Sequence, residues 1–177
     1  MAKISSTKSS RVSAAKGIKS YIRQIVFSRD NKGKGDIKVI YSMADTKHYI
    51  PMPEIPGEKD FNPYYMMLKM DINKPLYICN HILCIVNYQQ DGMTSRVLQS
   101  YEECPVSYAM LREAYLEHQE IPCMFAYRQC IHYVSSWIFA KRQKKKVNSL
   151  WRRKLVWMAV IPGVILNMWV CWKNRRH

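Results

Sequence analysis

Acidic side chains are scarce in this sequence of 177 residues. Asp and Glu number 13 against 28 Lys and Arg, which gives a formal net charge of +15 at pH 7. Such an excess of one sign favours an anionic partner, which in practice means nucleic acid, acidic lipid or an acidic protein. The alternative is a basic surface that only solvent contacts. Composition alone narrows the partner to these classes without choosing among them.

Catalytic sequence motifs are also missing. The chain contains no Gly-rich phosphate-binding loop, no nucleophile elbow and no His-Glu-x-x-His motif. Glu102 and Glu103 are adjacent, so their side chains diverge and do not suit an acid–base pair. We therefore predict that the chain is not an enzyme and binds no cofactor of its own.

The six cysteines lack the spacing of a disulfide framework or a regular zinc module. The N-terminus also lacks the apolar stretch of a secretory signal, so we expect reduced, packed cysteines. One constellation could hold zinc, because Cys79, His81 and Cys84 are residues of the types that zinc prefers. Both cysteines lie in an apolar run, where reduced cysteine commonly packs as core. We predict that no metal is bound.

The N-terminal segment contains no acid before Asp30, although it holds seven Lys or Arg and many Ser. This composition is typical of a mitochondrial targeting segment. Several of its apolar residues recur at spacings of three and four, which places them on one helical face. A basic arm that binds ribosomal RNA or lipid headgroups is the alternative.

The remaining chain is predicted to be mainly α, with helices at about 104–121 and 123–142 separated by Pro122. Four prolines between residues 50 and 63 exclude a continuous helix or a central strand there. Arg128 and His132 would be costly at mid-bilayer, so the second helix is expected to lie on a membrane or on protein. We divide the chain into a basic N-terminal segment (1–30), an extended Gly- and Pro-rich segment (31–75), a small matrix-side helical body (76–143), and a basic flank with an anchor (144–177). The expected fold is mainly α, with amphipathic helices, the extended Pro-rich segment and a small irregular α+β body before a single C-terminal transmembrane helix.

The anchor is an uncharged apolar run from Leu155 to Trp172. As a helix it would be about 27 Å long, close to the hydrocarbon thickness of about 30 Å. Transmembrane helices tolerate a central pair such as Pro162 and Gly163, and Asn167 would face a neighbouring helix. We predict a single C-terminal transmembrane helix, whose marking residues are Leu155, Pro162, Gly163, Asn167 and Trp172. A buried core helix is the alternative.

A basic flank precedes this run. Eight Lys or Arg lie between residues 141 and 154, against three after the run, which places the N-terminal body on the matrix or cytosolic side. Each base near acidic headgroups contributes about 1 kcal/mol. Cardiolipin or another acidic phospholipid is the expected ligand. The predicted headgroup ligands are Lys144, Lys145, Lys146, Arg152, Arg153 and Lys154.

Residues 150–174 resemble the transmembrane helix of subunit VIa of mitochondrial cytochrome c oxidase. Leu150-Trp151 is followed by basic residues, an apolar half, Ile161-Pro162-Gly163-Val164 and a second apolar half that ends at Lys173. The family's helix likewise begins with Trp-Lys and has a Leu-Pro-Gly-Val-like centre. The resemblance implies a single-pass protein of the mitochondrial inner membrane, with its N-terminal body in the matrix and a short C-terminus in the intermembrane space.

The resemblance also implies a function: a non-catalytic supernumerary subunit of a respiratory complex, cytochrome c oxidase being the first candidate. Its partners would be other subunits of that complex and membrane lipids, with heme and copper held by other chains. An accessory subunit of complex I, complex III or ATP synthase would carry the same features. Alternatives from other classes are a membrane-associated mitochondrial ribosomal protein and a tail-anchored adaptor of another organelle. Because of the anchor, we predict that nucleic acid is not the partner.

Overall fold

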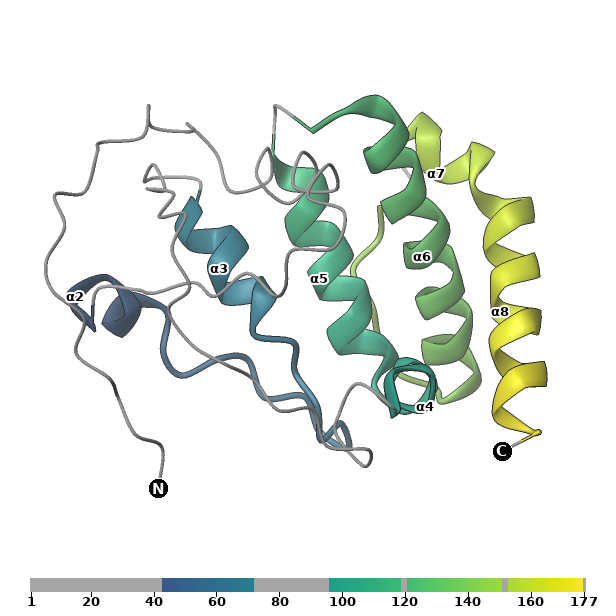
Figure 1. Cartoon of the computed structure of the whole chain (residues 1–177), viewed down its shortest axis with the longest axis horizontal. Helices are drawn as coiled ribbons and strands as arrows, with labels where there is room; N and C mark the ends of the chain where they lie inside the picture. The colour runs from purple at the N-terminus through teal and green to yellow at the C-terminus, as the bar shows by residue number, and fades with distance from the viewer. Residues whose placement is uncertain (1–42, 72–95, 119–120, 151–152, 177) are drawn as a thin grey trace, which may run out of the picture.

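The computed structural model of the chain describes residues 43–71, 96–118, 121–150 and 153–176 (Figure 1). Every regular element within these ranges is a helix. The first are the short helices α2 (Met43–Thr46), η2 (Lys47–Tyr49) and α3 (Tyr64–Asp71). They are followed by α4 (Val97–Glu103), α5 (Pro105–Glu117), α6 (Cys123–Arg142), α7 (Lys154–Met158) and α8 (Val160–Asn174).

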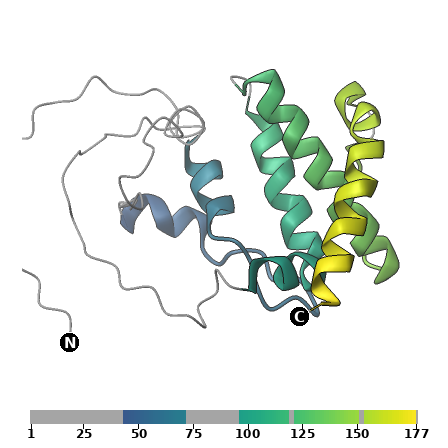
Figure 2. The same cartoon turned by 45° about the vertical axis from the view of Figure 1, so that its right-hand side comes forward.

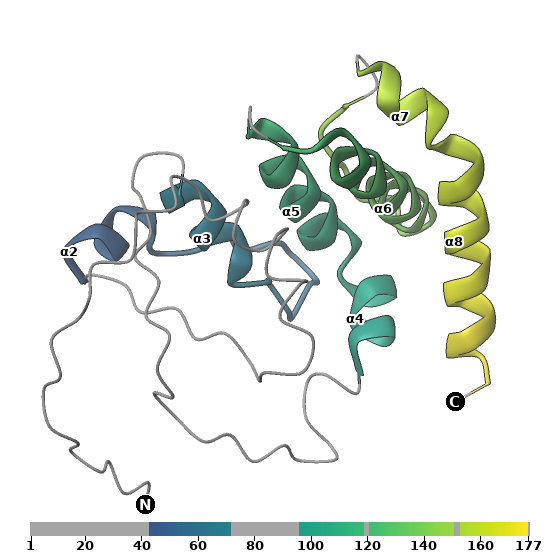
Figure 3. The same ribbon diagram turned by 45° about the horizontal axis from the view of Figure 1, so that its top comes forward.

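Helix α6 packs between α5 and α8 (Figure 3). Residues 143–150 return along α6 in an irregular conformation, and the buried Tyr133 hydroxyl holds this return by accepting a hydrogen bond from Leu150 N at 3.2 Å. The same hydroxyl donates to the carbonyl of Asn148. Because of this return, α8 starts beside the first half of α6 and runs parallel to it.

The boundaries of α5 and α6 follow from proline chemistry. Pro105 occupies the first turn of α5, where its missing N–H has no helical partner to lose. Pro122 immediately precedes α6, and the carbonyl of Pro122 accepts the first helical hydrogen bond from Ala126 N at 2.9 Å. The predicted helices at 104–121 and 123–142 are therefore confirmed, with the first ending at Glu117.

Small side chains allow α8 to approach α6 closely. A Cβ added to Gly163 would lie 2.6 Å from Val134 Cβ, which is far inside van der Waals contact. One turn before it, Ala159 is fully buried, and one turn after it the buried Asn167 donates from Nδ2 to the carbonyl of Ser135 at 3.2 Å. The inward side of α8 is thus a row of small or hydrogen-bonded residues fitted to α6.

The Pro-rich segment before α3 forms no regular element and lies against the start of α5. The Glu58 side chain is 1% exposed and accepts hydrogen bonds from Val106 N at 2.9 Å and Ser107 N at 2.8 Å. It also pairs with Lys145 Nζ at 3.1 Å. Glu58 therefore caps α5 and links the Pro-rich segment to the return segment after α6.

The predicted fold class was wrong in its C-terminal anchor. No helix among the described ranges combines the length and the apolar character that a bilayer crossing requires. The run from Leu155 to Trp172 is broken at Ala159 into α7 and α8. Pro162 explains the break, since it has no N–H to donate to the carbonyl four residues earlier. Asn167, predicted to face a neighbouring helix in a membrane, faces α6 of this chain, as does Gly163 one turn before it.

The predicted α+β body was also wrong, because the described part of the chain contains helices and no strand. The sequence also indicates a short β-like run at 37–43, which lies outside the described residues except for Met43, the first residue of α2. The apolar run at 76–88, whose periodicity does not decide between strand and helix, lies outside them as well. The described part of the body contains the helices α4, α5 and α6, which pack on one another.

Candidate functional site

Exposed apolar side chains form a continuous row on the side of α7 and α8 that faces away from α6. Their exposed fractions lie between 39% and 74%. They recur at spacings of three and four residues, which places them on one side of the helices. We call this row the outer face. Its members are Trp157, Met158, Ile161, Val164, Ile165, Met168, Trp169 and Trp172.

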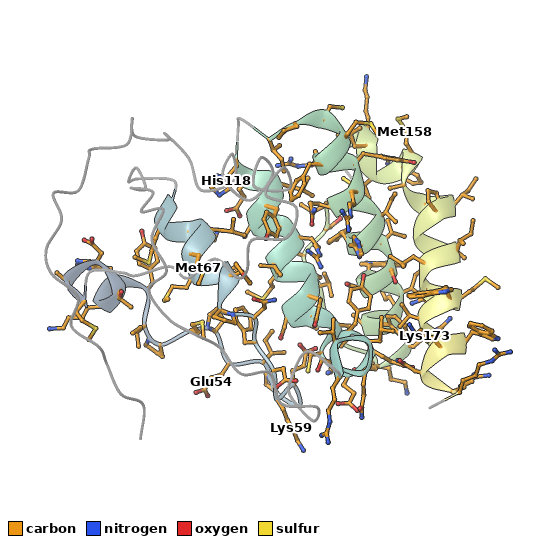
Figure 4. The ribbon with its side chains drawn as sticks, viewed as in Figure 1. Glu54, Lys59, Met67, His118, Met158 and Lys173 are labelled. Carbon is orange, nitrogen blue, oxygen red and sulfur yellow. The ribbon has the colours of Figure 1, made fainter. Side chains whose placement is uncertain are left out.

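The outer face lies at the edge of the molecule. Figures 1 and 3 show α8 as the outermost helix, and Figure 2, turned to bring that side forward, shows it in front of α6. In Figure 4, Met158 and Lys173 mark the two ends of the row. Single exposed hydrophobic residues are ordinary, but a contiguous apolar patch on a protein surface marks a binding surface. This row is the strongest candidate functional site among the described residues.

Basic residues border the outer face at its C-terminal end and contact its tryptophans. Lys173 Nζ lies 5.2 Å from the centre of the Trp169 ring, and Arg176 Cζ lies 3.8 Å from the centre of the Trp172 ring. Both are cation–π distances. No Asp or Glu follows Glu120 anywhere in the sequence. The border of the row is therefore positive.

The last turn of α6 adds to this positive charge. Arg142 Nη1 donates to Cys171 Sγ at 3.1 Å, and Gln143 and Asn174 both bond to Glu102 at the end of α4. The C-terminal ends of α6 and α8 thus meet at one place, where Glu102 and Glu103 are the nearby acids. We call the bases there the basic end. They are Lys141, Arg142, Lys144, Lys173, Arg175 and Arg176.

The headgroup ligands predicted from the sequence are separated by the fold. Lys144 belongs to the basic end, and Lys146 is exposed on the return segment. Lys145 is held by Glu58, and Arg153 donates from Nη1 to the carbonyl of Leu116 at 2.7 Å. Lys154 is exposed at the other end of the row, and Arg152 lies outside the described residues. Sequence reasoning did not group Lys141 and Arg142 with Lys173. No local sequence pattern indicates that α6 and α8 run parallel and bring these three bases to the same end.

The weak zinc candidates Cys79, His81 and Cys84 also lie outside the described residues. Within the described ranges, no group of three His, Cys, Asp or Glu could hold a metal ion. Cys104, Cys123, Cys130 and Cys171 are free thiols there. Burial raises the pKa of the Cys130 thiol, although Arg153 opposes the shift.

A second group of polar side chains lies between α4, α5 and α6. Its centre is Tyr101, whose hydroxyl donates to the carbonyl of His132 at 2.8 Å. Burial, together with the charges of Arg112 and Arg128, lowers the pKa of His132 to about 4, so the imidazole is neutral at pH 7. Gln129, Ser135 and Ser136 of α6 are also buried. No sequence motif singles out these residues, since they come from three helices.

Comparison with known protein families, curated proteins and solved structures finds no match to this chain. The resemblance to a cytochrome c oxidase subunit therefore stays a prediction. Function is inferred from the chemistry of the chain's own residues.

Proposed function

We propose that this chain is a non-catalytic accessory protein that attaches to an anionic lipid surface, with α7 and α8 lying in the plane of the lipid–water interface. The observation that carries this proposal is the outer face with its positive border. A helix that lies in the interface buries one apolar side to a depth of about 5–10 Å, and its basic residues reach the headgroups. The opposite side of α8 stays packed on α6.

Apolar burial supports this mode of attachment. Transferring the exposed half of a large apolar side chain out of water stabilises by on the order of 1 kcal/mol. The outer face has eight such side chains, so its insertion favours binding by several kcal/mol before ordering costs. Three of the eight are tryptophans, which favour the headgroup level because the ring is apolar and its N–H is polar.

Charge favours a lipid surface over a protein groove. The basic end and Lys154 border the row at its two ends, and each base near an acidic headgroup adds about 1 kcal/mol. Lysine is depleted in the cores of protein interfaces, whereas it is enriched beside apolar faces that enter membranes. The headgroups of an anionic membrane can neutralise the bases at both ends of the row, whereas a protein partner would need acidic residues around an apolar groove.

The non-catalytic part of the proposal rests on the missing motifs. An accessory subunit of a mitochondrial inner-membrane respiratory complex would need this kind of attachment. That narrower assignment rests on the resemblance at residues 150–174, and it stays a prediction, as does the binding of cardiolipin.

Vesicle co-sedimentation of the full chain tests the attachment. We expect binding to phosphatidylcholine vesicles that contain phosphatidylserine or cardiolipin, and weak binding to phosphatidylcholine alone. Ile165→Glu places a charge in the middle of the outer face and should weaken binding by on the order of tenfold or more. Met124→Glu is the matched control, because Met124 is 79% exposed on α6, off the outer face.

Equal binding of Ile165→Glu and the unchanged chain would contradict the proposal. A chain that ignores the vesicles but self-associates, and loses this association with Ile165→Glu, would show that the outer face binds protein instead. Helical circular dichroism of each variant confirms that the fold is retained.

A further inference from the structure

Arg112, in the middle of α5, has an unused hydrogen-bonding edge. Its Nη1 donates to Gln129 Oε1 at 3.0 Å, whereas its Nε is buried and has no acceptor. In a guanidinium group, Nε–H and one Nη2–H point the same way and form a fork that fits two oxygens of a phosphate or carboxylate. The Nη1 bond to Gln129 fixes the plane of the group and leaves this fork free.

The charge of Arg112 also lacks a counterion among the described residues. The groups that act on its pKa are the phenols Tyr101, Tyr108 and Tyr115, and the cation Arg128. Burial lowers the pKa of Arg112 without a carboxylate to oppose it. The buried Nε thus lacks both an acceptor and a counterion, and a bound anion would supply both.

Further polar groups lie in the same layer of the fold. Ser135 and Ser136 are fully buried on α6, and hydrogen bonding from their hydroxyls lowers the pKa of Tyr101 against the effect of its burial. Both hydroxyls act on Tyr101, which Arg112 also influences, so the four groups belong to one polar cluster. Native proteins satisfy nearly all buried polar atoms, so the unpaired Arg112 Nε is the atom of this cluster that a bound anion would satisfy. Arg128 directly precedes Gln129 on α6, is exposed, and provides positive charge on the solvent side.

We propose that the free edge of Arg112 binds one phosphate group, free or esterified, between α4, α5 and α6. Arg112 and Arg128 together carry two positive charges, which match the two negative charges of a phosphate dianion. His132 is neutral at pH 7 and adds no third positive charge. The site is independent of the outer face, since none of its residues belongs to α7 or α8. It adds a specific anion site to the proposed lipid attachment, and each can fail without the other.

Two-dimensional ¹H–¹⁵N NMR of the full chain tests this site, because a buried arginine Nε–H gives its own signal. Titration with inorganic phosphate at pH 7 should move the Arg112 Nε–H signal saturably, while sodium chloride at equal ionic strength should not. Glycerol 3-phosphate is the second probe, and it reports whether an esterified phosphate such as a lipid headgroup also fits.

Arg112→Lys keeps the charge but loses the fork, so we expect phosphate affinity, followed at the backbone amides of residues 128–136, to fall about tenfold. Arg128→Gln should lower the affinity for phosphate several-fold and leave the fold intact, because this side chain is exposed. If Arg112→Lys does not fold, the phosphate affinity of Arg128→Gln tests the proposal instead. The absence of a saturable shift with either probe would overturn the proposal. Unchanged affinity in Arg112→Lys, or in Arg128→Gln where the first variant is unfolded, would overturn it too.

Discussion

The Glu58 carboxylate joins three separate parts of the chain, and replacing it with Gln measures how much this junction stabilises the fold. Its Oε1 accepts from Val106 N at 2.9 Å and from Lys145 Nζ at 3.1 Å. Its Oε2 accepts from Ser107 N at 2.8 Å and Ser107 Oγ at 2.6 Å. A Gln side chain has only one acceptor oxygen. Whichever way its amide is turned, the amide NH₂ group faces two donors, either those at Oε1 or those at Oε2 of Glu58.

The expected cost follows from these contacts. Glu58→Gln loses two hydrogen bonds to a charged acceptor, each contributing about 1.5–3 kcal/mol. It also removes a negative charge from the N-terminus of α5, where an anion contributes about 0.3–1 kcal/mol. Lys145 is left without its carboxylate, although its side chain is 21% exposed and regains part of its hydration. We expect a loss of about 3–5 kcal/mol, a large share of the 5–15 kcal/mol typical of a folded domain.

Urea denaturation followed by helical circular dichroism measures this loss as a shift of the transition midpoint. Glu54→Gln is the matched control, because Glu54 lies exposed in the same Pro-rich segment and should change stability by less than about 0.5 kcal/mol. Lys145→Met removes only the ionic partner and should cost less than Glu58→Gln. If Glu58→Gln changes the free energy of unfolding by less than about 1 kcal/mol, the carboxylate does not hold these segments together.

Two further predictions concern α6 and its neighbours. Gly163→Ala places a methyl group 2.6 Å from Val134 Cβ and 3.1 Å from the carbonyl of Ile131, so urea denaturation should show a loss of about 1–3 kcal/mol, and an unchanged midpoint would contradict the close packing of α8 on α6. His132 has its pKa lowered by burial to about 4 from an ordinary value of 6.5, so the unfolded chain takes up a proton before the folded chain does, and stability should fall as pH decreases from 6.5 to 4. His132→Asn should reduce this pH dependence in denaturation midpoints, and an identical pH profile would refute the shift.

Local chemistry explains which parts of the fold are predictable from the sequence. Pro105 and Pro122 restrict the helices that follow them whatever the tertiary context, so α5 and α6 begin where the sequence places them. The Pro-rich segment is irregular for the same reason. These features depend on φ restriction and lost donors, which are properties of single residues.

The run from Leu155 to Trp172 shows where this reasoning fails. Hydropathy measures how apolar a run is, but it does not tell whether lipid or another helix of the same chain covers it. Here one side of α8 fits α6 through Gly163 and Asn167, while the other side stays exposed. The two sides look alike in sequence because both are apolar.

Contacts between distant residues were beyond the sequence altogether. Glu58 and Lys145 are 87 positions apart, and nothing in either local pattern indicates their pairing. The same holds for Arg112, whose neighbours come from α4 and α6 as well as from its own helix. For this reason the predicted headgroup ligands included Lys145, which the fold assigns to Glu58, and omitted Arg142.

The parallel course of α6 and α8 gives the basic end a second role. Each helix C-terminus carries a partial negative charge of about one half, and parallel helices bring two such ends together, which is unfavourable without nearby cations. Lys141, Arg142 and Lys173 lie in the last turns of these helices and offset that repulsion. The basic end has six bases against two acids and two helix ends, so positive charge remains for an anionic surface. Arg175 and Arg176, beyond the last turn of α8, are the bases that a lipid headgroup can engage without cost to helix packing.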